Sequence, residues 1–138
     1  MSFDIFLSVF DHGDLSGIPL STVRECFGRH VEVAEGAYWK LRYDAENSCN
    51  VDLSIDPADP NRVQGLAINR PCGDSRFWNA IFKLLQAGNI VVYFPGGAAP
   101  LVASEGVKAH MPPDMVESLG NPIIVDSGAA ILARIRAS

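Results

Sequence analysis

A histidine flanked by two carboxylates is the cluster in this sequence whose residue types best suit acid–base or metal chemistry. His12 stands between Asp11 and Asp14 in a glycine-containing loop. Imidazole and carboxylate groups can move protons near neutral pH and can bind divalent cations. The same residues are also typical of an ordinary solvated loop. His30 and His110 are solitary in the sequence, so we predict no metal site and no cofactor.

A serine and a pair of glycines are the other residues that could take part in catalysis. The segment VDSGAA, Val125 to Ala130, places Ser127 between an apolar run and a helix-like run. A nucleophile elbow requires a glycine two residues before the serine, and Val125 occupies that position. Ser127 is therefore predicted to cap a helix. Gly96 and Gly97 follow an apolar strand and could offer N–H groups to an anion or oxyanion, or simply form a turn.

Acidic residues gather on one predicted hairpin and on the turn that follows it. The alternation places Asp52 and Asp56 on one strand face, and Asp59 lies in the turn. Their spacing does not match a calcium-binding loop. They form either a solvated face or a docking surface for a basic protein, because complementary charge speeds and selects association. Arg70 is the isolated cation best placed for binding, although a salt bridge or a carbonyl contact would explain it equally well.

The stretch from Leu66 to Phe94 is predicted to position these residues, because it reads as strand, turn, helix and strand. Asp74 and Ser75 can cap the start of a helix that extends from Ser75 to Ala87. Its apolar face is formed by Phe77, Ile81, Leu84 and Leu85. The run from Ile90 to Phe94 has no polar break, which indicates a strand covered on both faces.

The remaining pattern predicts further strands around this unit. Apolar and polar residues alternate in four segments, Phe3–Val9, Tyr38–Asp44, Val51–Ile55 and Val63–Asn69. Pro19 to His30 reads as a short helix, and a last helix follows Ser127. We therefore expect one domain, residues 1–138, of α+β class, with mixed α/β as the alternative. The expected sheet is mostly antiparallel with five or six strands, and the helices pack chiefly on one face.

Composition limits the classes of function. The chain has 138 residues and a formal net charge of −5, which argues against nucleic-acid binding because such proteins need a basic face. The first residues do not form a signal peptide, and no apolar run approaches the ~20 residues of a membrane span. We expect a bacterial cytoplasmic protein with no membrane association. Cys26, Cys49 and Cys72 form no CxxC motif and are expected to be free thiols.

Several stretches carry a family resemblance. They are the opening MSFDIFL, AINRPCGDSRFWNAIFKLLQ (Ala67–Gln86), VVYFPGG (Val91–Gly97) and AHMPPDMVESLGNPIIVDSGAAI (Ala109–Ile131). Together they resemble a group of small uncharacterised bacterial proteins. In size, acidity and compactness, the chain is similar to the immunity proteins of polymorphic-toxin systems. This resemblance implies inhibition of a toxin and assigns no catalytic residue.

Two functions of different class follow. The first is a non-enzymatic protein-binding role, an immunity-type inhibitor that binds a basic toxin domain through Asp52, Asp56, Asp59 and Arg70. The second is a small enzyme or ligand-binding domain whose pocket lies near His12, Gly96, Gly97 and Ser127. A homodimeric structural protein is a third possibility, for which the sequence gives no specific signal.

Overall fold

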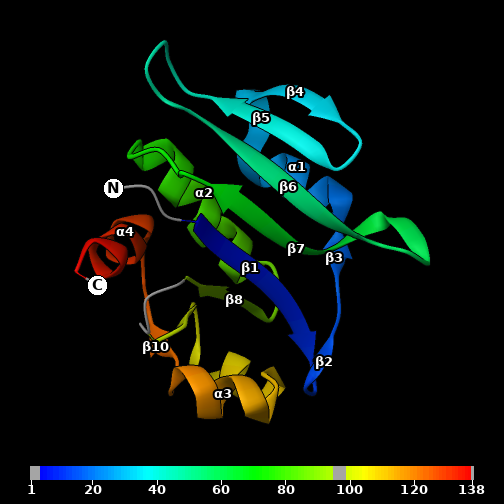
Figure 1. The fold of residues 1–138 in the computed structure, drawn as a ribbon, viewed down its shortest axis with the longest axis vertical. Coiled ribbons are helices and arrows are strands. Elements are labelled where there is room, and N and C mark those ends of the chain that lie inside the picture. The colour runs from blue at the N-terminus through cyan, green and yellow to red at the C-terminus, as the bar shows by residue number, and fades with distance from the viewer. Residues whose placement is uncertain (1–3, 95–98, 138) are drawn as a thin grey trace.

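The computed structural model describes residues 4–94 and 99–137 and has an α+β architecture (Figure 1). The strands are β1 (Asp4–Asp11), β2 (Asp14–Leu15), β3 (Ile18–Pro19), β4 (Val31–Glu35), β5 (Tyr38–Arg42), β6 (Ser48–Asp56), β7 (Asp59–Asn69), β8 (Ile90–Tyr93), β9 (Leu101–Val102) and β10 (Ile123–Ile124). The α-helices are α1 (Leu20–Phe27), α2 (Ser75–Gln86), α3 (Pro113–Leu119) and α4 (Gly128–Arg136). Two 3-10 helices are η1 (Gly28–His30) and η2 (Glu105–His110).

The sheet is larger than the sequence predicts. Its strand order is β10-β9-β8-β1-β7-β6-β5-β4, and β2 and β3 pair with β1 and β7 to give ten strands. The described pairs are antiparallel except β9–β10, which are parallel, so the sheet is mixed. The predicted α+β class is confirmed, but the expected mostly antiparallel sheet of five or six strands is too small, and the sheet includes one parallel pair. Four of the strands have only two residues, which is too short to produce a period-two pattern.

The predicted central unit forms as expected, with α2 between β7 and β8 in the chain. Asp74 caps α2 because its side chain accepts a hydrogen bond from the Arg76 N–H. The apolar face of the helix includes Phe77, Trp78 and Ile81, each at most 1% exposed. Their burial removes large apolar areas from water, which makes α2 a main source of stability.

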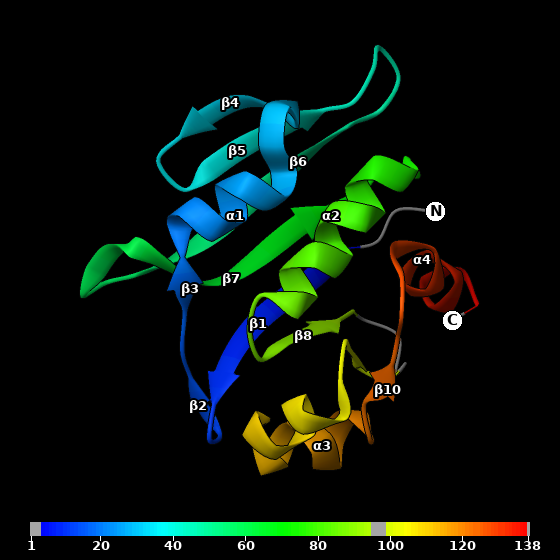
Figure 2. The same ribbon diagram turned by 180° about the vertical axis from the view of Figure 1, so that it is seen from behind.

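Three of the described α-helices pack on the main core. Figure 2 shows α1 and α2 in front of the sheet and α4 beside α2, and apolar residues of all three belong to the same core as Ile5, Leu7 and Val9 of β1. The N-terminus of α4 touches the backbone of α2 at Gly128. A Cβ atom added there would lie 2.5 Å from the Trp78 carbonyl carbon and oxygen. A glycine is therefore needed for these two helices to pack this closely.

The other face is covered at one end only. Val91 of β8 and Val102 of β9 form a separate cluster with Val107 and Met111. Neighbouring residues in a strand point to opposite faces, so Val91 points away from Ile90, which belongs to the main core. Met115 of α3 packs against this second cluster. The segment of η2 and α3 thus covers β8 and β9, and no helix of residues 4–94 and 99–137 covers the outer side of β5, β6 and β7.

The strands β5, β6 and β7 contain three of the predicted alternating segments and form an antiparallel meander. Gly65 lies opposite Ser54, beside a shift in the β6–β7 register. A Cβ atom at Gly65 would lie 2.5 Å from the Leu7 backbone oxygen. The alternation of apolar and polar residues thus predicts the strands of this meander. Gly65 permits the close approach of β1 to β7.

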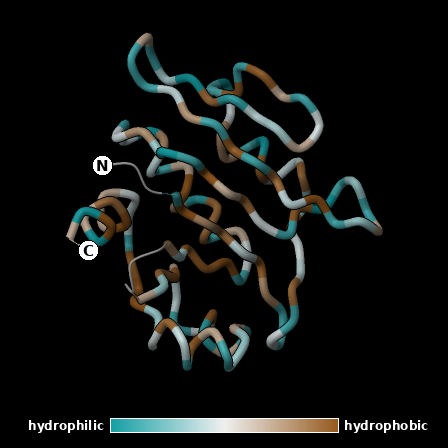
Figure 3. The backbone as a smooth tube through the Cα atoms, in the orientation of Figure 1, coloured by the Kyte–Doolittle hydropathy of each residue, from teal (hydrophilic) through white to brown (hydrophobic). Residues whose placement is uncertain are grey.

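The sheet ends at β4 on one side and at β10 on the other. The register of β4 against β5 shifts between Val31 and Val33. Glu32 and Glu35 are exposed on this edge strand. Figure 3 shows the contrast between the hydrophobic trace of β8 and the hydrophilic β6–β7 turn. In the part of the chain that the structure describes, no helix has the length and apolar character needed to cross a membrane.

Candidate functional site

The outer face of β5, β6 and β7 presents a row of exposed side chains. Asn50, Asp52 and Ser54 of β6 are exposed, while the residues between them are buried. Tyr38 of β5 lies opposite Asp52 and is 42% exposed. On the neighbouring strand, Ala67 pairs with Asp52. Such a face, backed by a packed core, offers a fixed surface for a partner.

A polar depression of about 480 Å³ lies at one end of this face. Its lining consists of Tyr38, Lys40, Ser48, Cys49, Asn50, Asn69 and Arg70. None of these described lining residues is acidic, and Lys40 and Arg70 contribute two cations. Arg70 has a φ of 49°, a conformation that is uncommon for a residue with a side chain. The predicted binding residue Arg70 therefore lies in a concave, cationic part of the outer face.

A second depression, of about 150 Å³, lies over β1 and β7. Phe6 and Tyr93 form one wall, with ring centroids 5.6 Å apart. Leu15 contributes another side and is 55% exposed. The small residues Gly65 and Ala67 are also in the lining. We call this the aromatic depression; its shape and apolar character suit an inserted side chain from a partner.

The three predicted acidic residues have different environments. Asp52 lies on the exposed outer face, as described above. Asp56 accepts a hydrogen bond from the Ala58 N–H at 2.8 Å, and Asp59 accepts one from the Asn61 N–H at 2.9 Å. These two carboxylates therefore shape the β6–β7 turn.

Cations share the outer face with these acids. Arg42 and Lys40 lie 3.2 Å and 3.8 Å from carboxylate oxygens of Glu32. Arg42, Lys40 and Glu32 are all at least partly exposed. The face is thus mixed in charge, with Asp52 as its exposed acid on β6.

His12 lies beside His110, which is 98 residues away in the chain. The His12 backbone N–H donates to His110 Nδ1 at 3.1 Å, so this ring nitrogen carries no proton. His12 Nδ1 is 2.6 Å from Asp11 Oδ1, and His110 Nδ1 is 3.5 Å from the same oxygen. The two imidazole rings meet edge to face with centroids 4.7 Å apart. Asp14, the other predicted neighbour, pairs with Asp11 across the turn.

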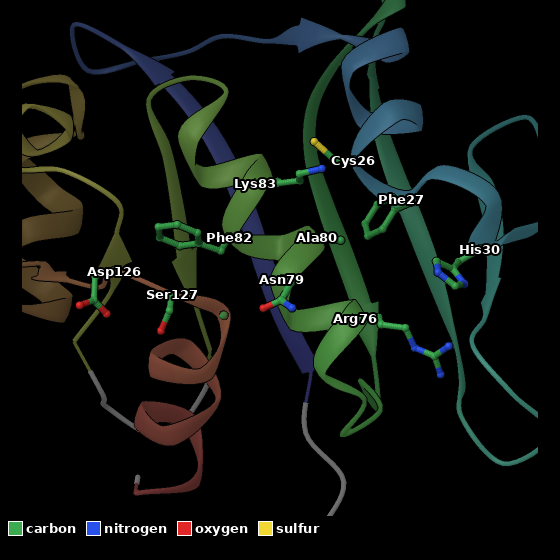
Figure 4. A pocket seen from close by; sticks show the side chains of 11 residues that line it. Cys26, Phe27, His30, Arg76, Asn79, Ala80, Phe82, Lys83, Asp126 and Ser127 are labelled. Atoms are coloured by element: carbon green, nitrogen blue, oxygen red, sulfur yellow. The ribbon is translucent and has the colours of Figure 1, made fainter.

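Ser127 lies on the helical side of the sheet, where it caps α4. Its Oγ accepts a hydrogen bond from the Ala130 N–H at 3.0 Å, which confirms the predicted cap. Ser127 also lines a groove of about 420 Å³ with Asp126, Asn79 and Lys83 (Figure 4). His12 is not among the described residues that line this groove.

The structure does not bring His12 and Ser127 into one described pocket. His12 lies in the β1–β2 turn, whereas Ser127 lies between β10 and α4. Gly96 and Gly97, the other two members of the predicted pocket, lie outside the described residues.

Two cysteines that the sequence places far apart interact in the structure. The Cys49 thiol hydrogen-bonds to Cys72, which lowers the pKa of the Cys72 thiol to about 7. The same hydrogen bond, together with burial, raises the pKa of Cys49. All three cysteines are free, as predicted. A lowered pKa makes Cys72 a reactive thiol, because the thiolate is the nucleophilic form.

A buried tyrosine hydroxyl lies near this pair. Tyr43 is 7% exposed, and its Oη has no hydrogen-bond partner among the described residues. Burial, followed by the charges of Cys49 and Cys72, raises the pKa of Tyr43. The Arg76 guanidinium lies over its ring, 5.5 Å from the centroid.

The sequence pattern does not reveal that His110 lies beside His12 or that Cys49 lies beside Cys72. Cys49 belongs to β6 and Cys72 precedes α2, and their contact depends on how β6 and β7 pair. The hydrophobic patterns predict strands and helices but not these long-range neighbours. A signal for Cys72 was available in its position just before the predicted helix cap at Asp74, where N–H groups can stabilise a thiolate.

Comparisons with protein-family models, with curated proteins and with solved structures found no match. The geometry of the described residues is therefore the basis for the function proposed below.

Proposed function

We propose that this protein is a non-enzymatic binding module that holds a basic protein on the outer face of β5, β6 and β7. In this proposal the partner is a bacterial toxin domain, and the protein acts in the cytoplasm as its immunity-type inhibitor. The strongest support is the outer face itself, which has exposed side chains and an aromatic depression and is covered by none of the described helices. Stable interfaces combine an apolar anchor with a polar rim.

Charge favours a basic partner. The net charge of −5 gives the protein an attractive long-range field for a cationic surface. Asp52 is the exposed carboxylate on the proposed face and lies next to Tyr38. A lysine or arginine of the partner can pair with Asp52 while an apolar side chain fills the aromatic depression. Lys40 and Arg70 line the polar depression and would repel any positive charge that a partner placed over it. They therefore favour a partner whose positive charge lies over Asp52 instead.

The first test is affinity capture of partners from a lysate of the native host with four immobilised proteins. They are the wild type, Asp52→Lys, Ser54→Arg and Glu25→Lys. Asp52→Lys reverses the central charge, and Ser54→Arg fills the aromatic depression. Glu25→Lys is the matched control, because Glu25 is exposed on α1 on the opposite side of the sheet.

The proposal expects one basic protein at near-stoichiometric amount on the wild-type and Glu25→Lys columns. Retention falls by at least about tenfold on the other two, the effect of losing ~1.4 kcal/mol of binding. That protein, expressed alone, is toxic, and co-expression of the wild-type chain removes the toxicity. Equal retention on all four columns, no retained protein, or a captured protein that is not toxic would each contradict the proposal.

Small-ligand binding is a second candidate, and the groove at Ser127 favours it. Asp126, Ser127, Asn79 and Lys83 give this groove both donors and acceptors (Figure 4). A melting-temperature screen of small polar ligands tests this candidate with wild type and Lys83→Ala. A ligand that stabilises the wild type and not Lys83→Ala supports it, whereas a full screen without such a ligand counts against it.

A further inference from the structure

Three potential metal ligands meet where the β1–β2 turn contacts the end of η2. Asp11 is the last residue of β1, His12 follows it in the turn, and His110 is the last residue of η2. One ligand atom from each residue lies within 4.8 Å of the other two. The Gly13 N–H donates to the His110 backbone oxygen at 2.9 Å. This backbone hydrogen bond therefore holds the two segments together and fixes the positions of the Cα atoms that carry the three side chains.

The hydrogen bonding of His110 is compatible with metal binding. Its Nδ1 accepts a hydrogen bond from the His12 N–H, so the lone pair of this nitrogen is present. Metal ions bind the neutral imidazole and the ionised carboxylate. An ion would replace the His12 N–H as the partner of His110 Nδ1. Because His12 is exposed, water can then satisfy that N–H.

The two distances that involve Asp11 Oδ1 need only a small adjustment to accept an ion. Bonds of ~2.0–2.1 Å from a tetrahedral Zn²⁺ place neighbouring ligand atoms about 3.3 Å apart. His110 Nδ1 and Asp11 Oδ1 are 3.5 Å apart, close to this value. His12 Nδ1 and Asp11 Oδ1 are 2.6 Å apart and would have to separate by about 0.7 Å. The side chain of His12 is 82% exposed, so it can turn without disturbing the core.

We propose that Asp11, His12 and His110 bind a divalent transition-metal ion of the Zn²⁺ type. Two imidazoles and one carboxylate favour Zn²⁺, Ni²⁺ or Cu²⁺, whereas Mg²⁺ and Ca²⁺ prefer oxygen ligands. Three protein ligands leave one tetrahedral position for water or for a side chain of a bound molecule. None of these three ligands lines the polar depression or the aromatic depression of the proposed partner-binding face.

The ion would join two parts of the molecule that are distant in the chain. In the chain, the strands β2 to β9 lie between the ligands Asp11 and His12 and the ligand His110. η2 belongs to the segment that covers β8 and β9. Binding to the folded state alone stabilises a protein by mass action. A bound ion would therefore hold this cover against the β1–β2 turn.

The test is calorimetric titration of the metal-free 138-residue chain with ZnCl₂, with MgCl₂ as the comparison. The variants are His12→Asn, Asp11→Asn and His30→Asn. Asparagine suits position 12 because His12 has a φ of 50°, and asparagine tolerates this left-handed conformation. His30 is the matched control, since its Nδ1 lies near the Arg42 backbone oxygen and away from this cluster.

The expected result is one Zn²⁺ bound per chain in the wild type and in His30→Asn, with no detectable Mg²⁺ binding. His12→Asn and Asp11→Asn should each bind Zn²⁺ at least about tenfold more weakly, as loss of a ligand requires. Zn²⁺ should also raise the melting temperature of the wild type and of His30→Asn more than that of His12→Asn. Unchanged affinity in His12→Asn, an equal loss in His30→Asn, or no Zn²⁺ binding by the wild type would overturn the proposal.

Discussion

The two faces of the sheet share the same strands but differ in the burial of their side chains. On the helical face, the side chains of Ile5, Val51 and Ile68 are fully buried. On the outer face, Asn50, Asp52 and Ser54 are exposed one residue away from such core positions. This difference indicates that one side of a strand can stabilise the fold while the other side binds a partner. Substitutions on one face should change stability, and substitutions on the other should change binding.

The largest expected effect is on the helical face. Trp78→Ala should destabilise the protein by ~3–5 kcal/mol, because it removes a large side chain that is 1% exposed. It also removes the hydrogen bond from Trp78 Nε1 to the Cys72 backbone oxygen, 2.8 Å long. Urea denaturation measures the loss. Lys83→Ala on the exposed side of α2 is the control, and equal stability of the two variants would contradict the comparison.

A smaller effect is expected where two helices meet. Gly128→Ala should cost about 1–3 kcal/mol, because the new methyl group would overlap the α2 backbone at Trp78. Ala129→Ser is a suitable control, since Ala129 is exposed in the same helix. Thermal unfolding of both variants checks the prediction. A Gly128→Ala protein as stable as the wild type would show that α4 can move away from α2 without loss.

The Asp74 cap of α2 should contribute less to the free energy of unfolding than the packing of α4 on α2. This contribution should depend on pH. Hydrogen bonds from Arg76 lower the pKa of Asp74 to about 2, below the ~3.9 of an unfolded chain. A carboxylate with a lowered pKa stabilises the fold above about pH 4, and that stability is lost as the pH falls towards 2. Asp74→Ala should cost about 1 kcal/mol at pH 7, the usual value of a cap.

Asp74→Asn separates the charge from the cap, because asparagine also caps helices. Chemical denaturation between pH 4 and pH 2 should show a steeper loss of stability in the wild type than in Asp74→Asn. Parallel curves for the two proteins would argue against a role for the ionised Asp74 side chain.

The reactivity of Cys72 should change without a large change in stability. With a pKa of about 7, its alkylation by iodoacetamide should reach half of its maximum rate near pH 7. Cys49→Ala removes the thiol that hydrogen-bonds to Cys72 and should move this midpoint to higher pH. Cys26→Ala is the control, because burial raises the pKa of Cys26 instead. Mass spectrometry follows each site, and a midpoint that does not move in Cys49→Ala would reject this assignment.

The smallest effect on stability is expected on the outer face. Asp52→Lys should change the free energy of unfolding by less than ~0.5 kcal/mol, because Asp52 is exposed. The same substitution should weaken partner capture by at least about tenfold. Urea denaturation of Asp52→Lys and of the control Glu25→Lys measures the change in the free energy of unfolding. A large loss of stability in Asp52→Lys would show that the two faces are not separable in this way.

The sequence was most informative where the hydrophobic pattern was long. The α2 helix was predicted from Ser75 to Ala87 and extends from Ser75 to Gln86, and the cap at Asp74 was confirmed. The buried strand after it was predicted to Phe94 and ends at Tyr93. In these segments, apolar residues recur at the period of the element, and packing agrees with local propensity.

Short elements and long-range contacts could not be predicted in the same way. β9 and β10 have two residues each, and their parallel pairing depends on the path of the intervening helices. The approach of His110 to His12 depends on that same path. The polar depression at Arg70 forms because three strands align their outer residues. Each feature depends on the register of the whole sheet, which no local sequence pattern encodes.

The edges of the sheet restrict the way in which another chain can bind. A long regular edge strand can accept a further strand from a partner through its backbone N–H and C=O groups. Here β4 is irregular at Val31 and Val33 and carries two glutamates, and β10 has only two residues. Both edges therefore discourage the addition of a strand and the growth of fibrils. A partner of this protein would have to recognise side chains on a face, which gives it sequence specificity that backbone pairing cannot supply.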